Sequence, residues 1–241
     1  MKKHSILTLM AIAAISFFIF SCKNEDLTSK NEIIAKDVLH SNKDIATVKA
    51  VVPAEVLQST DDVVLATTKY ENDGFKLQLP KTVSDQYLVK LADGEQNGLT
   101  ISDLTAKSTA VMFCAYDNTD NQTGIIYLVG MDLKYFASAT YLYSDKKFTI
   151  KGKLEEGSLS VEYDCNVKKG WNVLYLLQGI ANGTNTFTTQ KPSEVKMEWT
   201  FDSGLILPFN NFEDGIAKPV TFKTLQNNLI SVIEKMKSEN L

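Results

Sequence analysis

The sequence contains no arginine, and its only histidines are His4 and His40. Without arginine the chain lacks the planar, bidentate donor that proteins favour for binding phosphate, carboxylate and base edges. The formal net charge is −4, so the chain repels polyanions on average. We therefore expect no nucleic-acid partner.

The scarcity of histidine also limits the catalytic chemistry, because residues 46–241 contain none. A Ser-His-Asp or Cys-His relay and a histidine-rich zinc site cannot be assembled from this part of the chain. Glycine-rich phosphate-binding motifs are missing from the sequence as well. These absences predict a protein that is not an enzyme and that holds no cofactor and no metal.

The N-terminus has the layout of a secretion signal, with Lys2 and Lys3 followed by an apolar run from Ile6 to Phe20. The run is too short to cross a hydrocarbon core of roughly 30 Å as a stable helix. It ends in "IFSC", which resembles the lipobox of bacterial lipoproteins, whose cysteine becomes the lipid-modified first residue. The resemblance implies a signal peptide over residues 1–21 and a lipid anchor on Cys22.

Lys23, Glu25 and Asp26 follow the cysteine. This stretch resembles the acidic export signal of surface lipoproteins of Bacteroidota. The resemblance implies anchoring in the outer membrane and, beyond that, exposure on the outer cell surface. Without its signal the chain carries a net charge of about −6. Residues 22–45 are predicted as a flexible tether, in which "EIIAKDVL" could form a turn or two of helix, and residues 46–241 as a single domain.

The domain is expected to be all-β, because apolar residues alternate with polar ones in "GFKLQLP", "SLSVEYDCNV", "WNVLYLLQ" and "EVKMEWTF". "TAVMFCAY" and "GIIYLVGM" are apolar on both faces and are predicted at the centre of the structure. Turn sequences such as "DNTDNQTG", "VKKG" and Asn182-Gly183 predict successive hairpins. The pattern predicts an antiparallel β-sandwich, with a lipocalin-like barrel as the alternative.

The period changes near the C-terminus, where Phe222, Leu225, Leu229, Val232, Ile233 and Met236 form one helical stripe. We expect an amphipathic helix over residues 221–238 that covers one face of the sheet. Separately, "SLSVEYDCNVKKGWNVLY" resembles segments of β-sandwich surface lipoproteins of Bacteroidota whose function is unassigned. This resemblance implies a location and a fold but no chemistry.

Candidate site residues are few. Cys114 and Cys165 could form a disulfide in an oxidising compartment, or each could be a buried free thiol. Trp171 and Trp199 share strand faces with apolar residues and are predicted in the core. The tyrosines that could face a ligand are Tyr127, Tyr135, Tyr141 and Tyr143.

Two further groups of oxygen-bearing side chains are candidates for chemistry. Glu155, Glu156, Glu162, Asp164, Glu198 and Asp202 could in principle serve a glycosidase, but the strand pattern places several of them on solvated faces. The oxygen-rich loop "DNTDNQTG" offers calcium-type ligands yet lacks the EF-hand glycine and glutamate, which favours a polar hairpin tip.

The sequence thus predicts a lipid-anchored, non-enzymatic envelope protein that is a binding or accessory module for a glycan, a small ligand or a protein. The second-ranked alternative is a lipocalin-like carrier of an apolar small molecule, and the third is a carboxylate-dependent glycoside hydrolase.

Overall fold

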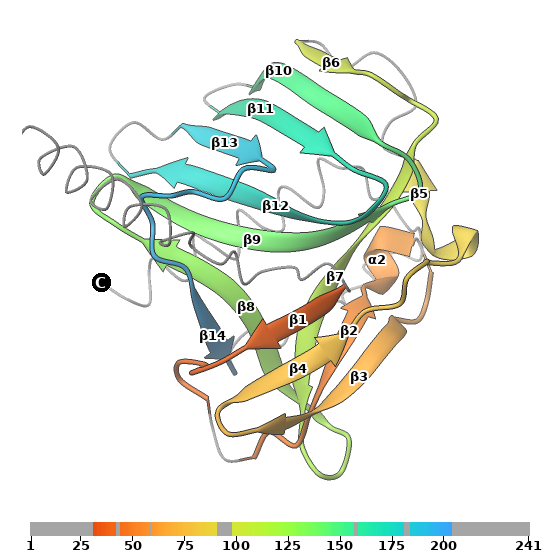
Figure 1. The fold of residues 1–241 in the computed structure, drawn as a ribbon, viewed down its shortest axis with the longest axis vertical. Helices are drawn as coiled ribbons and strands as arrows, with labels where there is room; N and C mark the ends of the chain where they lie inside the picture. Colours follow the sequence, from red (N-terminus) through yellow and green to blue (C-terminus); the bar gives the residue numbers. More distant parts are fainter. Residues whose placement is uncertain are drawn as a thin grey trace, which may run out of the picture.

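The computed structural model describes residues 31–203, except 42–43, 58, 91–97, 157–158 and 181–183. Strands are the main regular structure of this part of the chain (Figure 1), which confirms the all-β prediction. Its first half contains the short helix α2 (Ala54–Leu57), the 3-10 turn η1 (Asp85–Tyr87) and the strands β1 (Glu32–Ala35), β2 (Thr47–Val52), β3 (Val63–Glu71), β4 (Gly74–Gln78), β5 (Val89–Lys90), β6 (Leu99–Ile101) and β7 (Lys107–Tyr116). The second half contains β8 (Gln122–Met131), β9 (Tyr135–Ser144), β10 (Phe148–Glu156), β11 (Leu159–Val167), β12 (Gly170–Gly179), β13 (Asn185–Thr188) and β14 (Glu198–Asp202).

The strands form one open sheet in the order β1-β4-β3-β2-β7-β8-β9-β12-β13-β11-β10-β6, with β14 on β8 and β5 on β7. The sheet branches at β7, whose first half pairs with β9 and whose second half pairs with β8. Figure 1 shows the two arms, with β9 to β6 above and β1 to β4 below. Strands β7 and β8 join the arms, which agrees with their predicted central position.

The sheet is mixed, which corrects the prediction of purely antiparallel pairing. Strands β11 and β12 are joined by the predicted turn at 167–170, but they are not neighbours in the strand order. The four-residue strand β13 lies between them and pairs parallel with β11 and antiparallel with β12. The turn chemistry was predicted correctly, but the insertion of a third strand into the hairpin depends on pairing between distant residues.

Strand β1 contradicts the prediction of a tether over residues 22–45 and of a helical turn in "EIIAKDVL". It pairs antiparallel with β4, and its Ile33 is fully buried. Just beyond it, Leu39 exchanges two backbone hydrogen bonds with β14, from Leu39 N to Trp199 O and from Phe201 N to Leu39 O, each 2.9 Å. The short apolar patch is stabilised by partners that follow it by about forty residues or more, so local composition did not reveal it.

The first core fills the space between β1–β4, β7, β8, β9, β12 and β14 with large side chains. Trp199 contacts the rings of Phe75, Phe113 and Tyr141 at centroid distances of 5.6, 5.7 and 6.1 Å. Trp171 Nε1 donates a hydrogen bond of 2.8 Å to the carbonyl oxygen of Pro80. The core positions predicted for both tryptophans are confirmed.

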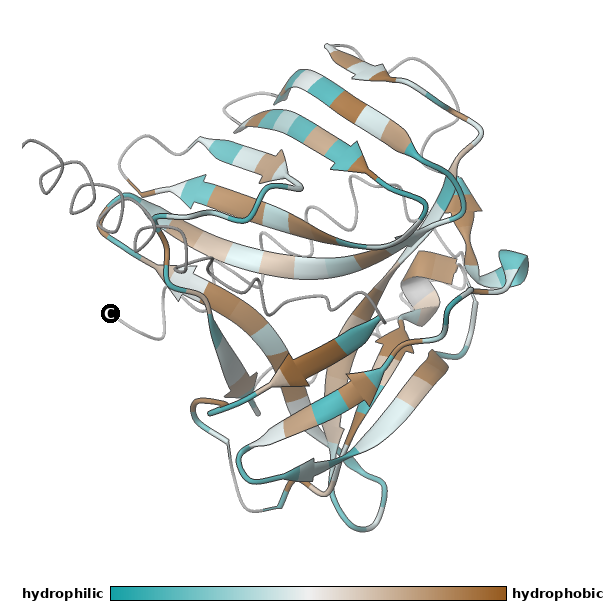
Figure 2. Cartoon of the chain, viewed as in Figure 1, coloured by the Kyte–Doolittle hydropathy of each residue, from teal (hydrophilic) through white to brown (hydrophobic). Residues whose placement is uncertain are grey.

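A second apolar surface lies on the opposite face of the same sheet. Alternation of side chains places Leu142, Leu174, Leu176, Phe187, Tyr163 and Ile150 on this face, which runs across β9, β12, β13, β11 and β10. Its reverse side on β10 and β11 is polar, and Figure 2 shows apolar and polar residues alternating along these two strands.

Within the described residues, no helix has the length and apolar character needed to cross a membrane. The predicted signal peptide, Cys22 and the helix predicted over 221–238 lie outside the described residues.

Candidate functional site

A pair of amide side chains interrupts the second apolar face. Gln178 near the end of β12 lies directly opposite Asn185 at the start of β13. Phe136 of β9 flanks Gln178, and Val161 of β11 flanks Asn185. These four residues form one row across the sheet, which we call the amide row.

The amide row lacks the hydrogen bonds that buried polar groups normally make. Gln178 and Asn185 are 9% and 3% exposed, and Ser138, on the next row, is 7% exposed. In the structure Gln178 Oε1, Asn185 Oδ1 and Ser138 Oγ are buried without a hydrogen-bond partner. An unpaired buried polar group costs about 1–3 kcal/mol, so these three oxygens together carry a substantial cost.

Asn172 shows what a structural amide looks like on the same face of β12. Its Oδ1 accepts a hydrogen bond of 2.8 Å from the backbone N–H of Lys168. Its Nδ2 donates to the carbonyl oxygens of Lys168 and Gly170 at 2.8 and 2.9 Å. Asn172 thereby holds the turn between β11 and β12. The side-chain oxygens of Gln178 and Asn185 make no comparable hydrogen bond.

The surroundings of the amide row are apolar and contain flat rings. Ser138, Leu176, Phe187 and Tyr163 form the neighbouring row. The rings of Tyr163 and Phe187 stack with centroids 5.3 Å apart. The row itself contains no ionisable side chain, so it can accept hydrogen bonds from neutral N–H or O–H groups but offers no charge to balance an ion.

The four tyrosines predicted to face a ligand differ in burial, two being buried and two half-buried. Tyr141 and Tyr143 are buried in the first core, where Tyr143 packs edge-on against Trp171 at 5.3 Å. For these two residues the ligand-facing prediction is wrong, because the paired strand β12 and the aromatic cluster cover them. Tyr127 and Tyr135 are half-buried, and Tyr135 begins β9 beside Phe136 of the amide row.

The two cysteines do not form a disulfide. Cys114 and Cys165 are buried free thiols in separate apolar clusters, so the disulfide alternative is wrong and the free-thiol alternative is confirmed. Burial, with a smaller effect of Asp62, raises the pKa of Cys114 to about 12. Burial also raises the pKa of Cys165 to about 12, and both thiols are therefore protonated near neutral pH.

Four of the carboxylates considered for hydrolysis lie on the polar reverse side of the sheet or near its edges, namely Glu155, Glu162, Asp164 and Glu198. Asp164 forms an ion pair with Lys151, and Glu198 pairs with Lys196 at 2.6 Å. Glu155 pairs with Lys153 at 2.7 Å, and these hydrogen-bonded and ionic contacts hold the pKa of Glu155 below its usual value. Glu162 is exposed. These four carboxylates have the surroundings expected of a solvated strand face.

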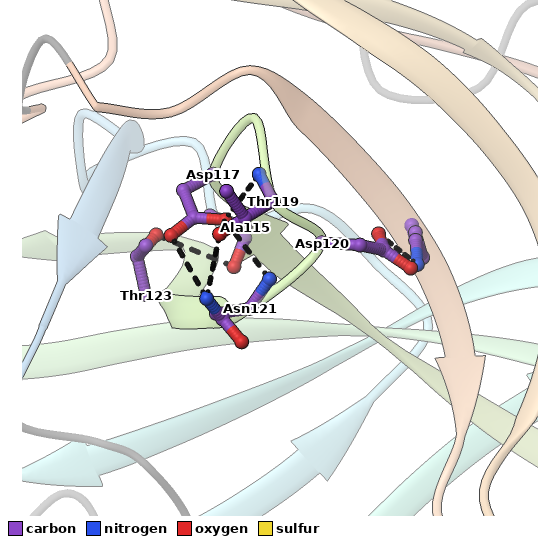
Figure 3. Close-up of polar contacts among 7 residues, drawn as sticks. Ala115, Asp117, Thr119, Asp120, Asn121 and Thr123 are labelled. Carbon is purple, nitrogen blue, oxygen red and sulfur yellow. Dashed lines mark hydrogen bonds and ion pairs between the residues drawn. The ribbon is translucent and has the colours of Figure 1, made fainter.

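The loop "DNTDNQTG" is a self-contained polar turn between β7 and β8 (Figure 3). The Asp117 carboxylate accepts hydrogen bonds from the backbone N–H groups of Asn121 and Thr119 at 2.9 and 2.8 Å, and from Thr119 Oγ1 at 2.8 Å. These bonds hold the pKa of Asp117 below its usual value. Asp120 pairs with Lys49 at 2.5 Å, so the best oxygen ligands already have protein partners.

No group of three or more His, Cys, Asp or Glu side chains in the described ranges is placed to hold a metal ion.

Sequence reasoning missed the amide row, although a usable signal was present. In "WNVLYLLQ", Asn172 and Gln178 share a strand face with Leu174 and Leu176, so two amides occupy positions that the alternation assigns to apolar residues.

Comparison of the chain with protein families, with curated protein sequences and with solved structures gives no match.

Proposed function

We propose that this protein is a lipid-anchored, non-enzymatic binding module of the bacterial cell envelope, located in the outer membrane. The observation that carries the binding role is the amide row, whose buried oxygens have no hydrogen-bond partner in the described part of the chain. Because these oxygens are buried, a ligand must open the row to reach them. When it supplies a donor, each oxygen gains a hydrogen bond and the apolar row beside them gains a contact. The best-matching ligand is uncharged and carries hydroxyl or amide groups, as glycans and peptides do.

The alternatives receive less support from the geometry. An apolar carrier needs an open interior, whereas the first core is filled by Phe75, Phe113, Tyr141 and Trp199. A glycosidase needs two carboxyl groups that face each other across a cleft, whereas Asp164 and Glu198 pair with lysines on the polar strand faces.

We also propose that the amphipathic segment 221–238 covers part of the second apolar face. The described members of that face all belong to one layer of the sheet, and an apolar sheet face is stable only against another layer. This arrangement would give the layered, sandwich-like architecture expected from the sequence. The amide row lies at the ends of β12 and β13, away from the middle of the face.

The binding role is tested by screening uncharged saccharides and peptide amides against the purified protein by calorimetry. Gln178→Leu and Asn185→Leu should each weaken binding of a hit by about tenfold or more, since each removes an acceptor worth about 1.4 kcal/mol or more. Thr186→Val is the matched control, because Thr186 lies on β13 next to Asn185 but on the opposite face. Unchanged binding in both leucine variants, or conversion of the ligand to a product, would contradict the proposal.

The anchor is tested separately by growing cells with a clickable fatty acid. The protein should be labelled, and Cys22→Ala should abolish the label because no other residue offers the acylated thiol at the end of the export signal. Equal labelling of the variant would rule out Cys22 as the attachment point.

A further inference from the structure

Three exposed aliphatic side chains gather at one corner of the sheet. Met131 ends β8, Leu133 lies in the turn between β8 and β9, and Ile180 directly follows β12; they are 67%, 97% and 47% exposed. The backbone N–H of Ile180 donates a hydrogen bond of 2.9 Å to Lys134 O, which joins the two segments. We call these three residues the aliphatic corner.

The turn that carries Leu133 is held rigidly. Asp132 Oδ1 accepts hydrogen bonds from the backbone N–H groups of Lys134 and Tyr135, both at 2.7 Å. Asp132 N donates a further bond of 3.0 Å to Tyr135 O. A leucine at such a turn tip has no local reason to be there, because polar residues and glycine are the usual choice. The fold therefore presents Leu133 outward in a fixed position.

The corner contrasts with the turn at the other end of β8. That turn, Asp117–Asn121, is polar and internally hydrogen-bonded. Strand β8 is ten residues long, which separates the two turns by roughly 33 Å. Exposed apolar character is thus found at one end of this strand and not at the other.

We propose that the aliphatic corner contacts the lipid bilayer to which the protein is anchored. Three side chains expose far less than the roughly 800 Å² per partner that a stable protein interface buries, whereas a bilayer accepts small apolar insertions. None of the three side chains carries a hydrogen-bond donor or a strong acceptor, and Lys134 beside them can extend its ammonium to a lipid phosphate. The inference rests on the proposed anchor at Cys22, which keeps the corner close to the membrane.

This contact would also place the candidate site near the membrane surface. Met131 pairs with Phe136, and Phe136 in turn pairs with Gln178 of the amide row. A ligand that reaches the amide row would therefore approach along the bilayer.

The experiment uses the lipidated protein, reconstituted into phosphatidylethanolamine and phosphatidylglycerol vesicles and labelled with the fluorophore NBD through Leu133→Cys. Cys114 and Cys165 are buried, so the label attaches to the introduced cysteine. Thr119→Cys, in the polar turn at the other end of β8, is the matched control. Because Leu133 is almost fully exposed, its replacement removes no core contact. Ile180→Cys supplies a second label at the same corner.

Labels at 133 and 180 should show blue-shifted emission, and nitroxides on the lipid acyl chains should quench them on the order of ten times more than the label at 119. Water-like emission at 133 and 180, in protein that floats with the vesicles, would overturn the bilayer contact. Cross-linking of two copies through the cysteine at 133, without acyl-chain quenching, would assign the corner to protein contact and also overturn it. Protein that fails to float would instead refute the anchor.

Discussion

At the scale of single residues, the amides on the second face fall into two classes. Asn172 makes three hydrogen bonds to its own turn, whereas the side-chain oxygens of Gln178 and Asn185 make none although both residues are buried. Natural proteins break the rule of paired buried polar groups mostly at functional or strained sites, because stability and function compete there.

This difference predicts opposite effects of the same substitution. Gln178→Leu should raise the free energy of unfolding by about 1–2 kcal/mol, because it removes an unpaired buried amide oxygen from an apolar face. Asn172→Leu should lower that free energy by about 1–3 kcal/mol, because it leaves backbone groups of Lys168 and Gly170 unpaired. Urea denaturation of the two variants and the parent measures both. If Gln178→Leu lowered the free energy of unfolding as much as Asn172→Leu does, Gln178 would have a structural role.

At the scale of elements, β14 depends on two glycines of β8. A Cβ atom on Gly124 would lie 2.3 Å from Asp202 O and 2.7 Å from the Phe201 ring. A Cβ atom on Gly130 would lie 2.2 Å from Lys196 O. Since these distances are shorter than any real contact, β14 can lie against β8 only while both positions have no side chain.

Gly124→Ala should therefore lower the free energy of unfolding by about 2–3 kcal/mol through displacement of β14. Gly170→Ala is the matched control, because a Cβ there meets nothing within 4 Å and only the positive φ of 93° is strained. The control should lose about 1 kcal/mol. Chemical denaturation compares the two, and a larger loss in the control would contradict the close packing of β14.

At the scale of the whole molecule, the two buried thiols make the free energy of unfolding fall at alkaline pH. The thiol pKa values of Cys114 and Cys165 are about 12 in the folded protein and 9.0 for an unperturbed thiol. The unfolded chain therefore binds fewer protons between these values. Stability is complete below about pH 9 and falls as the pH rises toward 12.

Each buried thiol should contribute a loss of about 1.4 kcal/mol per pH unit in this window. Unfolding free energies measured by urea at pH 8 and near pH 10.5 give the slope. In the double variant Cys114→Ala, Cys165→Ala the slope should be smaller, although the absolute stability is lower because of the cavities. An unchanged slope would mean that other groups, such as Tyr116, govern alkaline unfolding.

Much of the secondary structure could be predicted from the sequence, because alternation is a local property of the chain. The strands β4, β11, β12 and β14, the buried tryptophans and the solvated carboxylates follow from which residues are apolar at every second position. The central position of β7 and β8 follows in the same way from their two apolar faces.

Other features were decided by the tertiary structure alone, since they depend on which distant segments pair. Residues 32–35 become a strand because β4 lies beside them, and Tyr141 is buried because Phe113 and Trp199 pack against it. The amide row exists because β13 brings Asn185 beside Gln178, and Leu133 is exposed because its turn extends beyond the sheet. By itself the sequence determined which face of each strand is apolar; what lies against that face was determined by long-range pairing, which a period-two pattern does not encode.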